Sequence, residues 1–245
     1  ALIVLTPGTL AVLAAVGYIA IMAVGMFTSG HLFGFTYGDP SMMYVIVFFE
    51  VILSLYAFLL ARLLFKQWDC GFRPIDWSGM VWLLPNFVIM AALFFALFRT
   101  GMIEFSGLAL LIIVTMILVG FSEELMFRGV VLRAGLGEVS TGQAILISAV
   151  LFSLLHSVNV LAFVPLDGML QQLVLTFVFG LAMACYALRA NSLIPLIVFH
   201  ALWDMVQFLG GLYQADFGHL ITIGIVVNAV VAAALWWLVL RKRVV

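Results

Sequence analysis

Long apolar runs, separated by short polar or glycine-containing stretches, dominate the pattern of this chain. A bilayer core about 30 Å thick is crossed by a helix of about 20 residues, and the sequence divides into roughly eight such runs. Backbone exposed to lipid has to satisfy its own hydrogen bonds, so each run is expected to be a helix. The fifth and seventh runs are short, as helices beside a cavity often are. The expected spans are Leu10–Phe27, Met43–Phe65, Met80–Phe98, Phe105–Leu132, Ala144–Val158, Leu170–Leu188, Leu193–Leu209 and Leu220–Leu240.

Composition supports this pattern, because 67% of the 245 residues are hydrophobic, only 9% are charged and the mean hydropathy is +1.32. Soluble domains are about 45 to 50% apolar. The formal net charge of -1 gives no basic surface for nucleic acid. Cys70 in a polar loop and Cys185 in an apolar run do not suggest a disulfide framework. We therefore expect an all-α, polytopic membrane protein whose partner is the lipid bilayer, with one transmembrane domain over residues 1–245.

The distribution of positive charge indicates how the chain is oriented, since cytoplasmic loops are enriched in Lys and Arg. With a cytoplasmic N-terminus, only Arg99 falls outside, so both termini are expected to be cytoplasmic in a multi-pass plasma membrane protein. The loops near 29–40, 159–167 and 210–218 contain no Lys or Arg. The residues assigned to cytoplasmic ends are Arg62, Lys66, Arg73, Arg128, Arg133, Arg189, Arg241, Lys242 and Arg243.

A few polar side chains lie within the apolar runs, where they are costly. One charged side chain at the centre of a membrane costs roughly 2.5 to 3.5 kcal/mol on insertion scales, so such residues are usually functional. His31 and His219 map near the outer face, which leaves two histidines inside the membrane. Imidazole can accept, donate or ligate near neutral pH. The intramembrane set is Glu50, Glu123, Glu124, Arg128, His156, His200 and Asp204, with Asn86, Gln207 and Asn228 as weaker members.

Helical spacing gives these residues defined relations. Glu124 and Arg128 are i,i+4 and can pair, whereas Glu123 points about 100° away and remains free. His200 and Asp204 are also i,i+4, so Asp204 can orient the imidazole, or both can face one bound group. In the fifth run, Phe152 precedes His156 by one turn and is placed to wall one side of a site.

Each of these residues also has a purely structural interpretation. In that interpretation the pair of Glu124 and Arg128 serves only helix packing, and an isolated intramembrane histidine is more often a packing residue than a ligand. Glu50 is expected to make a helix-helix contact or to give Arg128 an extra partner. Asn86, next to Pro85, is expected to satisfy backbone groups that the proline frees.

Three motifs occur in order on successive apolar runs: Glu123-Glu124-x-x-x-Arg128, Phe152-x-x-x-His156 and His200-x-x-x-Asp204. This set resembles the CAAX protease and bacteriocin-processing family, which includes the type II CAAX prenyl proteases, also called Ras-converting enzymes. The resemblance covers residues 118–207, which we take as the catalytic core. It implies an intramembrane endopeptidase acting on a membrane-associated or lipidated peptide or protein, with prenylation of the substrate left open. It also leads us to expect a bacterial or archaeal membrane.

By that resemblance, Glu123 would be the general base that activates water together with His156. His200 and the residue at position 204 would stabilise the oxyanion. The prenyl proteases usually carry Asn at this position, and an ionised Asp204 cannot donate a hydrogen bond, so it would have to act protonated or by orienting His200. The residues that would support the site are Glu124, Arg128 and Phe152.

A metal mechanism is the rival, with His156, His200 and Glu123 binding zinc and leaving one position for water. No H-E-x-x-H signature is present, and we favour a mechanism without a cofactor. Outside this chemistry, the alternatives are a proton-coupled transporter and a non-catalytic immunity or assembly partner of the same fold. On the expected topology His200 lies near the cytoplasmic end of its helix and His156 near the outer end, so we expect a funnel from the cytoplasm to reach mid-depth.

Overall fold

The computed structural model describes residues 5–67, 69–101 and 104–241, and this part of the chain contains helices and no strands. Eight helical segments in it are long and apolar enough to cross a membrane. The fold class expected from sequence, an all-α bundle of about eight spans, is confirmed. The α-helices are α1 (Pro7–Phe27), α2 (Met43–Leu59), α3 (Trp77–Met80), α4 (Leu84–Phe98), α5 (Gly107–Glu124), α6 (Leu132–Leu136), α7 (Thr141–Leu155), α8 (Leu166–Ala190), α9 (Ile194–Leu212) and α10 (Leu220–Arg241).

Shorter helical turns of other geometry extend or join several of these helices into continuous spans. Thus α5, a π-helical segment and α6 together form one span, and a 3₁₀ segment lengthens the span that begins with α7. Among the other short elements, η1 and η3 end spans, η2 begins one, and η4 joins α3 to α4 within one. The short elements are η1 (Thr28–Leu32), η2 (Pro40–Met42), η3 (Leu60–Leu64), η4 (Val81–Leu83), η5 (Leu125–Val131) and η6 (His156–Ala162).

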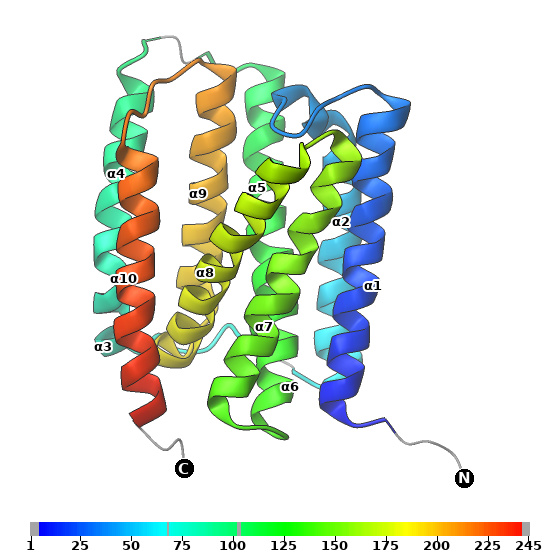
Figure 1. Ribbon diagram of the computed structural model, residues 1–245, viewed down its shortest axis with the longest axis vertical. Helices are drawn as coiled ribbons and strands as arrows, with labels where there is room; N and C mark the ends of the chain where they lie inside the picture. Colours follow the sequence, from blue (N-terminus) through cyan, green and yellow to red (C-terminus); the bar gives the residue numbers. More distant parts are fainter. Residues whose placement is uncertain (1–4, 68, 102–103, 242–245) are drawn as a thin grey trace.

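The helices form a bundle in which α1 begins and α10 ends at the same end (Figure 1). We call this the terminal end, and the other the distal end. Helix α5 packs against both α2 and α9, while Leu110, Val114 and Ile117 on its remaining face are exposed. Helix α8 is oblique: it packs on α7 toward the distal end and reaches α10 toward the terminal end (Figure 1).

The burial pattern is that of a protein in lipid, with large apolar side chains outside and ionisable groups inside. Phe48, Phe95 and Val174 are exposed by 67%, 65% and 63%, whereas Glu124 and Arg128 are fully buried. Lipid removes the usual penalty for exposed apolar surface and leaves the interior as the only place where polar groups find partners.

Polar residues mark the beginnings of several helices. The Ser106 hydroxyl accepts a hydrogen bond from the Ala109 amide at the start of α5, at 3.1 Å. Ser140 and Gln143 form a reciprocal capping box at the start of α7. These caps satisfy amides that have no partner within the helix, and they fix where each span begins.

A glycine allows α5 and α9 to approach closely beside the site. A Cβ atom at Gly120 would lie 2.8 Å from the Ile197 carbonyl oxygen and 2.9 Å from the Ala201 amide nitrogen. Any larger residue would push the two backbones apart. Gly120 therefore holds the acidic turn that follows it within reach of the histidine on α9.

One expectation about the spans needs correction. The fifth span is not short, because η6 continues it to Ala162 and gives 22 residues. Arg128, which was also expected in the intramembrane polar set, is fully buried in the bundle. Lys242 and Arg243 lie outside the described residues. A single domain over the whole chain stays a prediction.

Candidate active site

The acidic motif lies where α5 gives way to η5, in the interior of the bundle. Arg128 Nη1 donates to Glu124 Oε1 at 3.0 Å, and both side chains are fully buried. The pairing expected from the i,i+4 spacing is confirmed. The Arg128 guanidinium also lies over the Phe152 ring, 4.1 Å from its centroid. Arg128 thus ties the acidic helix to α7 as well as to its own turn.

The π-helical geometry of η5 leaves backbone carbonyl groups that accept hydrogen bonds from side chains outside η5. The Ser148 hydroxyl donates to the Phe127 carbonyl at 2.8 Å, and Gln67 Nε2 donates to the Gly129 carbonyl at 2.8 Å. π-helical turns interrupt the regular bonding of a helix and are frequent at functional sites. Here the turn places Arg128 under the acidic pair and is held in place by side chains from outside the span.

His200 on α9 is the residue on which the carboxylates converge. Its Nδ1 lies 2.8 Å from Glu124 Oε1, and its Nε2 lies 3.8 Å from Glu123 Oε2 and 3.4 Å from Asp204 Oδ2. The short contact is with Glu124, so Glu124 orients the imidazole more directly than Asp204, which sequence spacing offered as one possible orienter. Spacing reveals contacts within a helix, whereas this one joins α5 to α9.

His156 is placed at the point where α7 ends and η6 begins. Its Nδ1 lies 3.0 Å from the Phe152 carbonyl oxygen, which fixes the ring and leaves Nε2 for another partner. The Phe152 ring packs against it, with centroids 5.0 Å apart. His156 and Glu123 line one cavity, and no hydrogen bond between them is found among the described residues.

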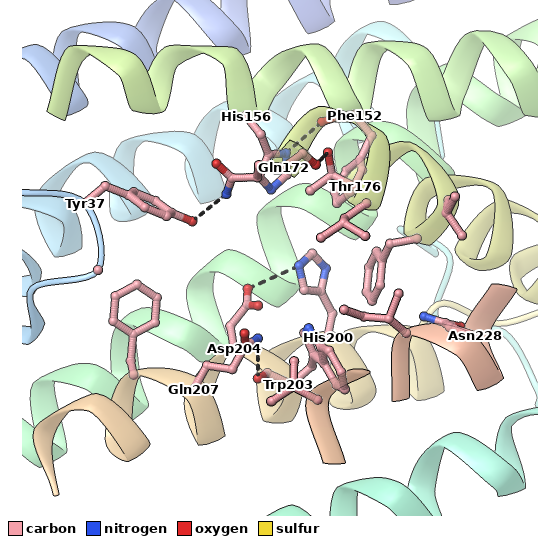
Figure 2. A pocket seen from close by; sticks show the side chains of 17 residues that line it. Tyr37, Phe152, His156, Gln172, Thr176, His200, Trp203, Asp204, Gln207 and Asn228 are labelled. Atoms are coloured by element: carbon pink, nitrogen blue, oxygen red, sulfur yellow. Dashed lines mark hydrogen bonds and ion pairs between the residues drawn. The ribbon is translucent and has the colours of Figure 1, made fainter. Parts of the chain in front are cut away.

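His156, His200 and Asp204 line a cavity of about 370 Å³ (Figure 2), whereas Glu123 lines the neighbouring space that it shares with His156. His200, Asp204 and Trp203 line it from α9, and His156 and Phe152 line it from α7 and the turn that follows. Figure 2 shows the His200 ring facing Asp204, with His156 on the other side of the space. The apolar part of the wall comes from α8 and α10 and includes Leu175, Val178, Phe179, Ile221 and Ile225. The intramembrane polar cavity expected from sequence is therefore present.

One wall of the cavity was not anticipated from the sequence. Gln172 Nε2 donates to the Tyr37 hydroxyl at 3.0 Å, and Asn159 Nδ2 donates to Gln172 Oε1 at 3.0 Å. Burial first, and the nearby Asp204 carboxylate second, raise the pKa of Tyr37 to about 12. Tyr37 thus keeps its proton at neutral pH. A single tyrosine in a loop gives no sequence signal for such a role.

The cavity lies toward the distal end of the bundle. Tyr37 and Gly38 from the loop before α2 line it, as do Gln207 and Ile221. The expected funnel from the terminal end is wrong. That expectation treated the depth of His156 as anomalous. In the structure, Tyr37 and Gly38 from the distal loop before α2 line the same cavity as His156.

Two further candidates from the sequence, Glu50 and Asn86, make contacts between helices. Glu50 accepts a hydrogen bond from the Ser122 hydroxyl at 2.9 Å, which confirms the predicted helix-helix contact and joins α2 to α5. Asn86 does not patch backbone near Pro85. Its Nδ2 instead donates to Tyr186 Oη at 2.8 Å and to Asn228 Oδ1 at 3.0 Å, so it links α4, α8 and α10.

Zinc binding by His156, His200 and Glu123 stays an alternative prediction. Among the described residues, no group of three or more His, Cys, Asp or Glu side chains is arranged to hold a metal ion. The Nδ1 atoms of His156 and His200 both lie close to a protein oxygen. Cys70 and Cys185 are both free and buried.

Comparison with known proteins gives a match to a family model. Residues 105–206 match the family model described as type II CAAX prenyl endopeptidase Rce1-like. We call this the Rce1-like segment, because it is similar to that family. The resemblance predicted from the three motifs is confirmed, and the Rce1-like segment contains every residue of those motifs. No curated protein and no solved structure matches the chain significantly.

Proposed function

We propose that this chain is an intramembrane endopeptidase in which Glu123 activates the hydrolytic water. The observation that carries the proposal is the state of Glu123, which is buried, with 6% exposed, and whose Oε2 has no hydrogen-bond partner among the described residues. A buried carboxylate oxygen without a partner is costly, and a water molecule would satisfy it. Cleavage of a hydrophobic or lipidated peptide by membranes containing the chain, and its loss in Glu123→Gln, tests the proposal.

The reaction follows from the positions of the groups. Glu123 takes a proton from water while His156 orients that water, and the hydroxide adds to the peptide carbonyl carbon. Glu124 holds His200 through Nδ1, which leaves the Nε2–H group to donate to the developing oxyanion. Asp204 assists by holding His200 rather than by donating. The proton on Glu123 then passes to the leaving amine as the C–N bond breaks.

The supporting residues hold this arrangement. Glu124 fixes His200, Arg128 neutralises Glu124, and Phe152 packs against both the guanidinium and His156. The apolar walls from α8 and α10 suit a hydrophobic or lipidated substrate. Whether that substrate is prenylated is a separate part of the proposal, to be tested by comparing one peptide with and without the lipid.

We further propose that Tyr37 donates to the substrate carbonyl. Tyr37→Phe removes one hydrogen bond and is expected to lower kcat/KM about tenfold. The phenol keeps its proton at every pH below its pKa of about 12, so the loss should be the same from pH 6 to pH 9. The measurement is kcat/KM across that range, with Tyr44→Phe, an exposed tyrosine on α2, as the matched control. A variant whose deficit changes across this range would contradict the assignment.

Zinc dependence is tested by metal content. Since the donor atoms do not converge on one point, we expect less than stoichiometric zinc in the purified chain and the same content in His200→Ala. Elemental analysis of both proteins gives the answer. One zinc per chain in the wild type, lost in His200→Ala, would overturn the metal-free mechanism.

We also propose that both termini are cytoplasmic, so that the cavity lies in the non-cytoplasmic half of the membrane. Thr36→Cys, in the exposed distal loop, should react with an impermeant maleimide on intact cells. Val139→Cys, exposed at the terminal end, should react only after lysis. The native cysteines are buried and give little background. The opposite labelling pattern would invert the proposed topology.

A further inference from the structure

A second, smaller cavity of about 70 Å³ lies beside the site, between α1, α2 and α5. We call it the methionine cavity, since five of the chain's 12 methionines line it: Met22, Met26, Met42, Met43 and Met116. It shares Tyr37, His156 and Asp204 with the large cavity, so the two spaces meet at the catalytic groups. These five methionines are between 1% and 6% exposed.

The polar end of the methionine cavity is formed by two carboxyl groups. Tyr18 donates to Ser122 at 2.7 Å, Ser122 donates to Glu50 Oε2 at 2.9 Å, and this chain of bonds leaves Glu50 Oε1 without a partner. Glu50 is fully buried and lines the same cavity as Glu123, whose Oε2 also has no hydrogen-bond partner among the described residues. Two buried carboxyl oxygen atoms without a hydrogen bond, on residues that line one cavity, indicate a missing ligand.

The size and chemistry of this space fit water. A cavity holds a water molecule when it offers more than about 10 to 15 Å³ and two to four polar partners. The methionine cavity exceeds that volume, and Glu50, Glu123, His156 and Asn159 supply polar atoms. Methionine side chains offer water few hydrogen bonds. Any water in the methionine cavity is therefore held at the end formed by Glu50 and Glu123.

Hydrolysis consumes one water for each peptide bond, and a hydrophobic substrate in the large cavity covers the approach from that side. We propose that the methionine cavity stores the hydrolytic water and that Glu50 is the positioning residue that anchors it beside Glu123. This inference rests on the proposed peptidase function. It adds a role for α1 and α2, which lie outside the Rce1-like segment.

Hydroxyl radicals generated from water by X-ray radiolysis provide a direct test, because they oxidise methionine to its sulfoxide wherever water lies next to the sulfur. Met22 and Met116 should be oxidised at least about fivefold faster than expected from their exposures of 4% and 2%. Met90 and Met183, with exposures of 2% and 0%, are the reference for buried methionines outside the cavity. Equal rates for the two pairs would overturn the proposal of stored water.

Variants of Glu50 test its anchoring role. Glu50→Leu should reduce oxidation of Met22 and Met116 to the reference rate and lower kcat about tenfold, with KM unchanged. Glu50→Gln keeps a polar side chain at this end of the cavity, so it should retain most of the methionine oxidation and most of kcat. Thr115→Val removes a buried hydroxyl that bonds only its own helix, and it controls for general loss of polarity in α5. Unchanged oxidation and kcat in Glu50→Leu would overturn the role of Glu50.

The two proposals fail in distinguishable ways. Oxidation of the cavity methionines needs no substrate, so it reports stored water even if the chain cleaves nothing. Cleavage that survives in Glu123→Gln would remove the peptidase mechanism and leave the oxidation pattern intact. Cleavage that depends on Glu123 but not on Glu50, with unoxidised cavity methionines, would remove the water store alone.

Discussion

Glu123→Gln is expected to reduce peptide cleavage by about 10² to 10⁴ fold, the range that a positioned general base contributes. Glutamine has nearly the same shape, so the packing around residue 123 is retained while the group that accepts the proton is lost. Initial cleavage rates in membranes, at matched amounts of protein, give the measurement. The effect should fall on kcat, because Glu123 acts on water and not on the bound peptide.

The matched control is Glu104→Gln, which makes the same substitution at an exposed position shortly before α5. Its rate should equal that of the wild type. His156→Ala should also lose activity, since it removes the group that orients the water. Full activity in both Glu123→Gln and His156→Ala would exclude the proposed chemistry, whatever the family resemblance.

Arg128→Met is expected to destabilise the protein by about 3 to 5 kcal/mol, the usual cost of removing one partner of a buried ion pair. The substitution keeps a long apolar side chain against Phe152 but removes the cation-π contact and leaves Glu124 buried with only His200 as a charged partner. Thermal unfolding in detergent, followed by the loss of helical circular dichroism, measures the change.

The double variant Glu124→Gln, Arg128→Met separates charge from packing. Removing both charges should recover part of the loss, because no unpaired ion remains inside the bundle. Arg99→Met, at the exposed end of α4, is the control and should change stability little. A loss below about 1 kcal/mol in Arg128→Met would mean that the pair resembles a surface ion pair, for which that value is typical.

Relations along one helix could be predicted from the sequence. The spans are set by apolar length, and the observed first span, Pro7–Leu32, contains the expected Leu10–Phe27. The pairing of Glu124 with Arg128 follows from i,i+4 geometry. Both predictions need only the local chain.

Relations between helices could not be predicted in the same way. The contact of His200 with Glu124 depends on how closely α5 approaches α9, which Gly120 permits. Tyr37 reaches the cavity through a loop whose path is set by its bond to Gln172. A single sequence carries no direct signal for either tertiary distance.

The π-helical turn was also beyond sequence reasoning. A regular helix was assumed through Leu132, whereas the geometry changes at Leu125. Bonds from Gln67 and Ser148, both distant in the chain, stabilise the changed turn. The register of Arg128 is therefore a property of three spans together, and local propensity does not decide it.

The placement of α1 and α10 has a practical consequence for labelling. Both helices meet the terminal end of the bundle, while the cavity is lined by the distal loop (Figure 1). A fluorescent protein attached beyond either helix would be separated from the distal loop by a membrane core of about 30 Å. Fusions at both ends can thus report expression and folding in living cells while the entrance stays clear for substrate.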